Sequence, residues 1–197
     1  MDIKKLGNSL LIFTINRLIE ILGIFIFCFG ILLLISLISY SPSDPNFIFP
    51  ENTEIKNILG FQGSYMADLF FQSSGLVAFL IPFTFIFTGI NIFRRKEIFL
   101  LIENTFFITL YALVGTLFFG FYYENSFSFY INGNGGFIGN YLNKTSIVNI
   151  IKSYENVFYY FFIFLVLVLF LKSLNFSIKG FLNFLKTINK LLFKKKE

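Results

Sequence analysis

Four long apolar runs constrain the fold of this chain more than any other feature of its sequence. They cover residues 18–38, 75–93, 98–120 and 157–174. A helix needs about 20 mainly apolar residues to cross ~30 Å of hydrocarbon, so each run is close to the required length. The last run is the shortest, but Lys172 near its end can extend its ammonium group toward the headgroups. The sequence therefore predicts an all-α integral membrane protein with four transmembrane helices.

The composition agrees with this class and argues against enzyme chemistry. Of the residues, 56% are hydrophobic and only 14% charged, and mean hydropathy is +0.75. Histidine is absent, which removes the commonest general base and metal ligand. The single cysteine, Cys28, cannot form an internal disulfide. We expect no catalytic residue, no metal and no cofactor in this chain.

The basic residues predict the orientation. With four spans, one side of the membrane holds 13 of the 16 Lys and Arg residues: Lys4, Lys5, Arg17, Arg94, Arg95, Lys96, Lys172, Lys179, Lys186, Lys190, Lys194, Lys195 and Lys196. By the positive-inside rule, this side is cytoplasmic. The chain would have segment 1–17 and its C-terminus inside, with outer loops at 39–74 and 121–156. The first span lacks a following A-x-A site, which favours an uncleaved signal anchor.

A proline-rich stretch, YSPSDP at residues 40–45, follows the first span. Proline disfavours helical geometry in the residue before it, so Pro42 and Pro45 must end the helix. The side-chain oxygens of Ser41, Ser43 and Asp44 can satisfy backbone N–H groups in a turn. The stretch is therefore expected to terminate the helix at the water interface.

A second polar stretch, residues 57–82, leads into the second span. Gly60 and Gly63 allow backbone conformations closed to other residues, and Ser64 is a candidate N-cap of a short outer interfacial helix. Asp68 would then lie near the positive end of that helix. Pro82, inside the second span, predicts a kink or a local break.

These two stretches closely resemble the amino-terminal four-helix membrane domain of FtsK-type DNA translocases. A weaker likeness is the glycine-rich segment 135–139 in the second outer loop. The resemblance rests on the following residues: Ser41, Pro42, Ser43, Asp44, Pro45, Asn57, Gly60, Gly63, Ala67, Asp68, Gly75 and Pro82. It implies a protein of the bacterial inner membrane that acts at the division septum as an anchor and scaffold. Its implied partners are membrane lipids, division-machinery membrane proteins and further copies of itself.

In that family, a linker follows the membrane domain and leads to a ring-shaped cytoplasmic ATPase that pumps DNA. This chain has no G-x-x-x-x-G-K-[ST] phosphate loop. We therefore expect it neither to hydrolyse ATP nor to contact nucleic acid directly, whether it is a fragment or a stand-alone membrane protein. Residues 175–197 have apolar residues at helical spacing beside lysines, which predicts an amphipathic basic segment on the inner leaflet or the start of a linker.

Glu103 is the candidate polar site within the membrane. An intramembrane carboxylate is a functional candidate by default, but Glu103 is near the inner end of the third span. It could reach the cytoplasmic interface or pair with Arg94 or Arg95. The alternative function is a small channel or transporter subunit that uses Glu103 and the polar face of the second span. Charged residues are nearly absent from the span centres, which argues against this alternative.

Overall fold

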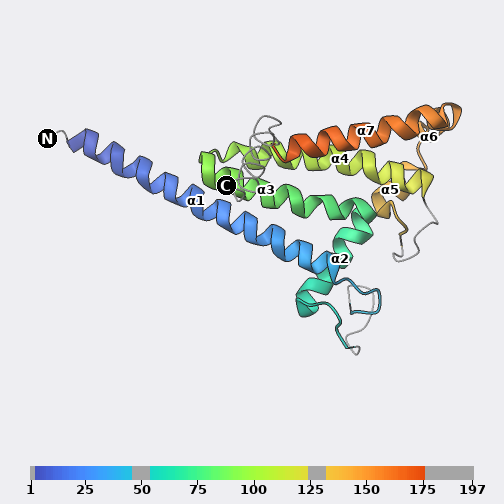
Figure 1. Ribbon diagram of the computed structural model, residues 1–197, viewed down its shortest axis with the longest axis horizontal. Helices are drawn as coiled ribbons and strands as arrows, with labels where there is room; N and C mark the ends of the chain where they lie inside the picture. The colour runs from blue at the N-terminus through green and yellow to red at the C-terminus, as the bar shows by residue number, and fades with distance from the viewer. Residues whose placement is uncertain (1–2, 46–53, 124–131, 176–197) are drawn as a thin grey trace, which may run out of the picture.

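The computed structural model describes residues 3–45, 54–123 and 132–175. All regular secondary structure in these residues is helical, and no strand occurs in them. The elements are α1 (Ile3–Ile38), α2 (Gly60–Ser74), the 3-10 helix η1 (Gly75–Phe79), α3 (Leu80–Arg95), α4 (Phe99–Tyr122), α5 (Gly136–Leu142), α6 (Ile147–Ser153) and α7 (Glu155–Ser173) (Figure 1). Four segments are long and apolar enough to cross a membrane: Gly7–Ile38, Gly60–Arg95, Phe99–Tyr122 and Glu155–Ser173. The prediction of an all-helical chain with four such helices is confirmed.

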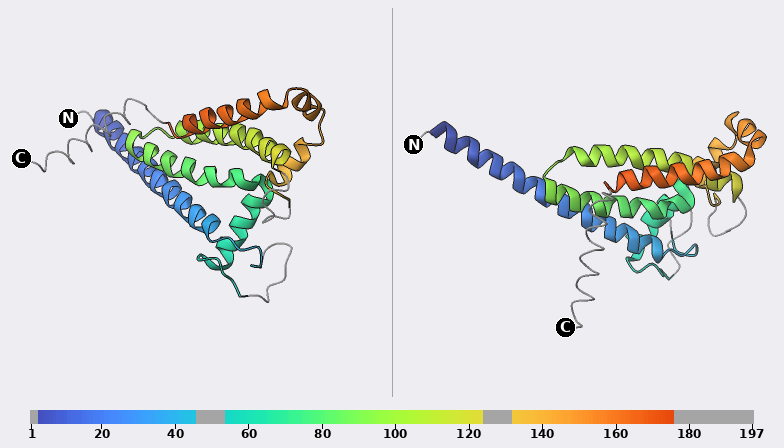
Figure 2. Two further views of the ribbon diagram at one scale, coloured as in Figure 1. Left: turned by 45° about the vertical axis from the view of Figure 1, so that its right-hand side comes forward. Right: turned by 45° about the horizontal axis from the view of Figure 1, so that its top comes forward.

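The four long helices do not surround a single axis. Helix α1 packs along α3 and against α2, α4 packs against both α3 and α7, and α7 contacts α3 near its end (Figure 2). The largest core cluster lies where α1, α2, η1, α3 and α4 meet, and it includes Leu37, Phe71, Val77, Ile81 and Tyr111. The elements are therefore joined most firmly at the end of the molecule that carries α2.

Helix α1 is longer than the first apolar run. It begins at Ile3 and has 36 residues, about 54 Å at ~1.5 Å per residue. Residues 3–17 contain no proline and many leucines and isoleucines, so the helix continues on the N-terminal side of residue 18. Its first turns project past the end of α3 (Figure 1), and Leu10 and Phe13 there are more than half exposed, at 60% and 57%.

The break before the second span is centred on Gly75 rather than on Pro82. Gly75 has φ 56° and ψ −140°, a conformation that side-chain-bearing residues rarely adopt, and the 3-10 turn Gly75–Phe79 follows it. Pro82 lies in the first turn of α3, where a missing N–H removes no helical hydrogen bond. The predicted break therefore exists, but it lies several residues earlier. As a result, α2 runs at a steep angle to α3 (Figure 1).

The connection between α4 and α7 contains two short helices, α5 and α6. The side-chain amides of Asn132, Asn134 and Asn140 donate hydrogen bonds within this loop or to neighbouring helices. One example is the Asn132 amide, which donates to Gln72 Oε1 of α2 at 2.8 Å.

Polar side chains of the spans bond to one another across helices. Thr84 of α3 contacts the hydroxyls of Tyr111 at 3.1 Å and Ser173 at 2.8 Å. The Asn104 amide donates to Thr88 Oγ1 at 2.8 Å, and Asn91 donates to the carbonyl of Leu174 at 3.3 Å. Such bonds typically contribute about 0.6–2 kcal/mol each in a membrane. They join α3 and α4 to the end of α7.

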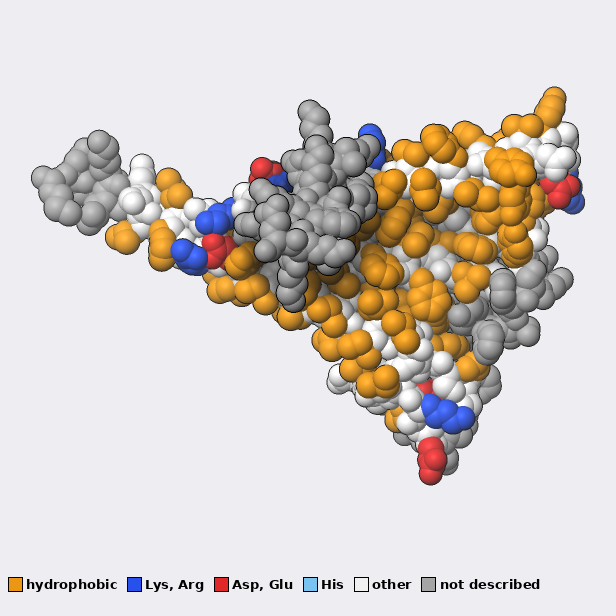
Figure 3. Space-filling view, in the orientation of Figure 1, with side chains coloured by type: hydrophobic (Ala, Val, Ile, Leu, Met, Phe, Trp, Pro, Cys, Tyr) orange, Lys and Arg blue, Asp and Glu red, His pale blue; other side chains and the backbone are white. Residues whose placement is uncertain are grey.

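The surface suits a lipid environment. Figure 3 shows hydrophobic side chains over most of the spans, whereas the charged side chains gather toward the ends of the molecule. Large apolar residues such as Phe25, Ile102 and Phe164 are 71%, 67% and 64% exposed. An exposed apolar surface of this extent would aggregate in water but is stable against acyl chains.

Candidate functional site

Several residues of the two polar stretches come together where α1 ends and α2 begins. We call this cluster the outer hub, and it consists of Ser36, Tyr40, Asp44, Asn57, Ser64 and Asp68. Apart from Tyr40, these residues are 5% exposed or less. Buried polar groups are costly unless they are hydrogen-bonded, so such a cluster is stable only when its members satisfy one another.

Asp44 closes the first outer loop. Its carboxylate accepts hydrogen bonds from the backbone N–H groups of Lys56 and Asn57, each at 2.9 Å. Asp44 is 1% exposed, and its backbone N–H donates to the carbonyl of Ser41 at 3.1 Å. Bonds from N–H groups to an ionised acceptor are about twice as strong as neutral ones. Asp44 thereby joins the two ends of the loop.

Asn57 connects this loop to both neighbouring helices. Its amide donates to the carbonyl of Ser36 in α1 at 2.9 Å, and its Oδ1 accepts from the N–H of Leu59 at 3.1 Å. The Ser36 hydroxyl in turn donates to the carbonyl of Gly63 in α2. A Cβ atom on Gly63 would collide with Asn57 Oδ1, so the glycine makes this close contact possible.

Ser64 and Asp68 have different roles from those predicted. Helix α2 begins at Gly60, so Ser64 is inside it rather than at its N-cap, and its hydroxyl donates to the carbonyl of Pro45 at 3.0 Å. Asp68 lies in the middle of α2 and not near its positive end. Its Oδ1 accepts from the Tyr40 hydroxyl and from Gln72 Nε2, both at 3.3 Å. Both side chains therefore hold the proline-rich turn against α2.

The other family-motif residues surround the hub or lie apart from it. The hydroxyls of Ser41 and Ser43 are 2.9 Å apart in the turn. Ala67 is fully buried in the core of α2, and Pro82 is buried in α3. Gly60 has φ 67° and begins α2 after a turn closed by a bond from its N–H to the Asn57 carbonyl at 2.9 Å.

Gly75 forms a second contact point, between the two outer loops. The N–H of Leu76 donates to the carbonyl of Asn134 at 2.9 Å, and a Cβ atom on Gly75 would overlap that carbonyl. Gly135 and Gly139 of the glycine-rich segment lie against the backbone of α4 at Thr116 and Gly120. No local sequence pattern predicts that these segments, about sixty residues apart, meet.

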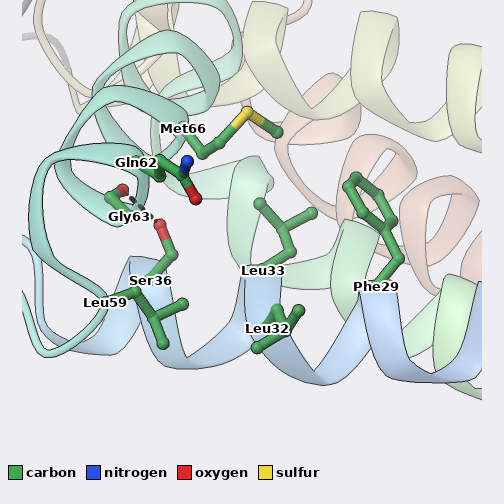
Figure 4. A pocket seen from close by; sticks show the side chains of 8 residues that line it. All are labelled: Phe29, Leu32, Leu33, Ser36, Leu59, Gln62, Gly63 and Met66. Carbon is green, nitrogen blue, oxygen red and sulfur yellow. Dashed lines mark hydrogen bonds between the residues drawn. The ribbon is translucent and has the colours of Figure 1, made fainter.

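A small cavity lies beside the hub. It has a volume of about 290 Å³ and lies between Phe29, Leu32, Leu33 and Ser36 of α1 and Leu59, Gln62, Gly63 and Met66 on the other side (Figure 4). Its lining contains no ionisable side chain. The cavity therefore offers apolar space next to the hub but no acid or base for chemistry.

Glu103 does not make the ion pairs considered for it. It is exposed on α4, and the structure places no ion pair between it and Arg94 or Arg95. Instead, Glu20 of α1 pairs with the cationic turn, because its Oε1 lies 3.0 Å from Lys96 Nζ and its Oε2 contacts Arg17. Glu20 was missed in the sequence, although its spacing of three residues from Arg17 was visible there.

We expect Glu20→Gln to weaken the α1 contact with the α3–α4 turn only slightly. The Arg17 and Lys96 side chains are 57% and 39% exposed, so water screens both pairs, and only a small loss of stability is expected. Thermal unfolding in detergent should show a small decrease in midpoint. Glu97→Gln, an exposed carboxylate in the same turn, is the control and should leave the midpoint unchanged.

The geometry favours structural roles for these carboxylates. Within residues 3–45, 54–123 and 132–175, no group of three His, Cys, Asp or Glu side chains could hold a metal ion. Asp44 and Asp68 already accept two hydrogen bonds each from protein groups. What the hub can do is fix the shape of the surface where α1 ends and α2 begins.

Comparison with known proteins gives the family. The profile described as the 4TM region of DNA translocase FtsK/SpoIIIE matches residues 16–186. The chain belongs to this family. An FtsK/SpoIIIE membrane domain also accounts for the four candidate spans and the polar outer motif.

Curated FtsK proteins from Rickettsia agree with this assignment. The DNA translocase FtsK of Rickettsia typhi is 29% identical over 112 residues, which are 54% of this chain and 15% of that protein. The Rickettsia prowazekii protein of the same name is 28% identical over 111 residues, 54% of this chain and 14% of that protein. The Rickettsia bellii protein is 34% identical over 67 residues, 34% of this chain and 9% of that protein. The chain thus spans only a small part of these FtsK proteins, and no solved structure matches it.

Proposed function

We propose that this chain is the membrane anchor of an FtsK-type DNA translocase and a septal-targeting scaffold in the bacterial inner membrane. The observation that carries the proposal is the outer hub. Residues that resemble the FtsK membrane domain are used to hold the outer loop against α1 and α2, and the carboxylates among them bond to protein groups. A rigid outer surface suits recognition by other proteins, because little ordering is needed on binding.

The charge pattern supports an orientation with both termini inside. The turn between α3 and α4 carries Arg94, Arg95 and Lys96, and Glu20 near Arg17 pairs with it. The outer hub lies at the C-terminal end of α1, away from this turn. In this orientation α2, at its steep angle to α3, would lie along the outer membrane surface (Figure 2).

The proposed role of this chain follows from the segment that the family profile matches. This chain supplies anchoring and outer contacts, with division-machinery membrane proteins, lipids and further copies of itself as partners. DNA translocation, for which the relatives are named, would depend on an ATPase motor outside the matched membrane segment. In this proposal the chain makes no direct contact with nucleic acid.

The localisation of the chain tests this function. A fluorescent protein that matures only in the cytoplasm would be fused after Glu197, and dividing cells would be imaged. We expect a band at midcell, several-fold brighter than the lateral membrane. Uniform fluorescence around the envelope would contradict septal targeting, and a lack of signal despite full-length protein on a blot would contradict the inward C-terminus.

Glu103→Gln tests the scaffold against the channel or transporter alternative. The side chain is exposed and has no described ion pair, so we expect midcell enrichment and division within about 10% of the unsubstituted chain, since exposed polar changes rarely cost more than ~0.5 kcal/mol. Ion or solute flux into vesicles that contain the chain should also be unaffected. A flux that the unsubstituted chain supports and Glu103→Gln abolishes would favour transport instead.

A further inference from the structure

We propose that the groove between α1 and α3 binds one anionic phospholipid of the inner leaflet. The groove has a volume of about 420 Å³ and lies between Ile24 and Phe27 of α1 and Ile90, Phe93 and Arg94 of α3. Its only ionisable lining residue is Arg94, at the end nearest the α3–α4 turn. An apolar channel with a cation at one end matches an acyl chain with an anionic headgroup.

The groove exists because two glycines bring the helices together. A Cβ atom on Gly23 would lie 2.8 Å from Phe93 N, and one on Gly89 would lie 2.5 Å from Phe27 N, so the backbones of α1 and α3 nearly touch. Larger side chains of α1 and α3 flank this glycine contact and form the walls of the groove. Ile24 and Phe93 are 51% and 46% exposed, so the groove opens toward the surrounding lipid.

The charges around the mouth of the groove are unbalanced. Glu20 lies one helical turn before Ile24, but its carboxylate is already matched by Lys96 and Arg17. Arg94 and Arg95 are exposed, and no described side chain forms an ion pair with either. The cations Arg17, Arg94, Arg95 and Lys96 outnumber the acids Glu20 and Glu97 in this region. Basic pockets between helices on the cytoplasmic side are suited to acidic headgroups.

A second copy of this chain fits the groove less well. All copies insert into the membrane in the same orientation, so Arg94 and Arg95 of two neighbours would lie at the same depth. Packing across this face would then place like charges next to each other, and they would repel. An anionic phospholipid has a negative headgroup that complements Arg94 and a flexible acyl chain that complements the apolar lining of the groove.

Native mass spectrometry of the detergent-solubilised chain tests the proposal. The probe is an equimolar mixture of phosphatidylglycerol and phosphatidylcholine, two lipids that differ in headgroup charge. We expect one retained phosphatidylglycerol, favoured about fivefold or more over phosphatidylcholine, as one cation near an acidic headgroup allows. Arg94→Gln should abolish the preference, whereas Arg95→Gln, outside the groove lining, should retain most of it.

A second pair of variants tests the groove itself. Ile24→Trp fills the groove from its exposed wall and should remove the adduct, whereas Phe25→Trp on the outer face, 71% exposed, should retain it. Unfolding midpoints in lipid-free detergent should agree among all variants, because these positions are exposed. Equal retention of the two lipids, or equal effects of Arg94→Gln and Arg95→Gln, would overturn the proposal. The proposal would also be overturned if the chain formed a dimer in place of the lipid adduct and Ile24→Trp removed that dimer.

Discussion

Asp44→Ala is expected to destabilise the chain by about 3 kcal/mol and to release the first outer loop. The substitution removes the acceptor of two backbone N–H groups, and an unsatisfied buried donor costs about 1–3 kcal/mol. The unfolding midpoint in detergent should fall by roughly 6–12 °C for a chain of this size. Amide hydrogen exchange should accelerate at Lys56 and Asn57, which lose their partner, and remain slow in α3.

Glu54→Ala is the matched control for this prediction. Glu54 is a carboxylate of the same loop, but it is exposed, and no described bond joins it to another residue. We expect its substitution to leave both the midpoint and the exchange rates unchanged. Similar exchange of the Asn57 amide in the unsubstituted chain and in Asp44→Ala would show that the loop is not held as described.

Gly75→Ala is expected to have an even larger effect, about 4 kcal/mol. The backbone at Gly75 is strained for any residue with a Cβ atom, which costs about 1–3 kcal/mol. The added methyl group would also displace the carbonyl of Asn134 and break its bond to the N–H of Leu76, and the loop would lose its position on α2 and α4. Faster amide exchange at Leu76 and in α5 would report this release.

Gly60→Ala separates the cost of backbone strain from the cost of the lost contact between the loops. Gly60 also has a positive φ, 67°, but nothing lies within 4 Å of a Cβ atom added there. Its substitution should cost only the backbone term, about 1–2 kcal/mol, and should leave α5 protected from exchange. Equal midpoints for Gly60→Ala and Gly75→Ala would show that the contact between the outer loops adds no stability.

The sequence predicted the helices well because a bilayer imposes simple requirements. Long runs of Leu, Ile and Phe have few alternatives to a spanning helix, and paired prolines must end one. The length of α1 was underestimated because the first 17 residues were assigned by their charges. Nothing but the absence of helix-breaking residues showed that α1 begins at Ile3.

The contacts of the site were harder to predict because they join residues far apart in the chain. Asp44 could be identified as a turn residue, but its partners, the N–H groups of Lys56 and Asn57, carry no sequence signal. Ser64 fitted an N-cap by local pattern, yet a bond to Pro45 determines its role. The resemblance to the FtsK membrane domain indicated which residues matter, and the fold shows what they contact.

The measurement that tests the central claim most directly is the midcell enrichment of the Asp44→Ala chain. Cells would carry the fluorescent fusion of the unsubstituted chain, of Asp44→Ala or of Glu54→Ala, at equal amounts in the membrane. If the outer hub holds the surface that division proteins recognise, Asp44→Ala should spread evenly while the other two form midcell bands. A full midcell band for Asp44→Ala, in cells where its outer loop exchanges freely, would contradict the role assigned to the hub.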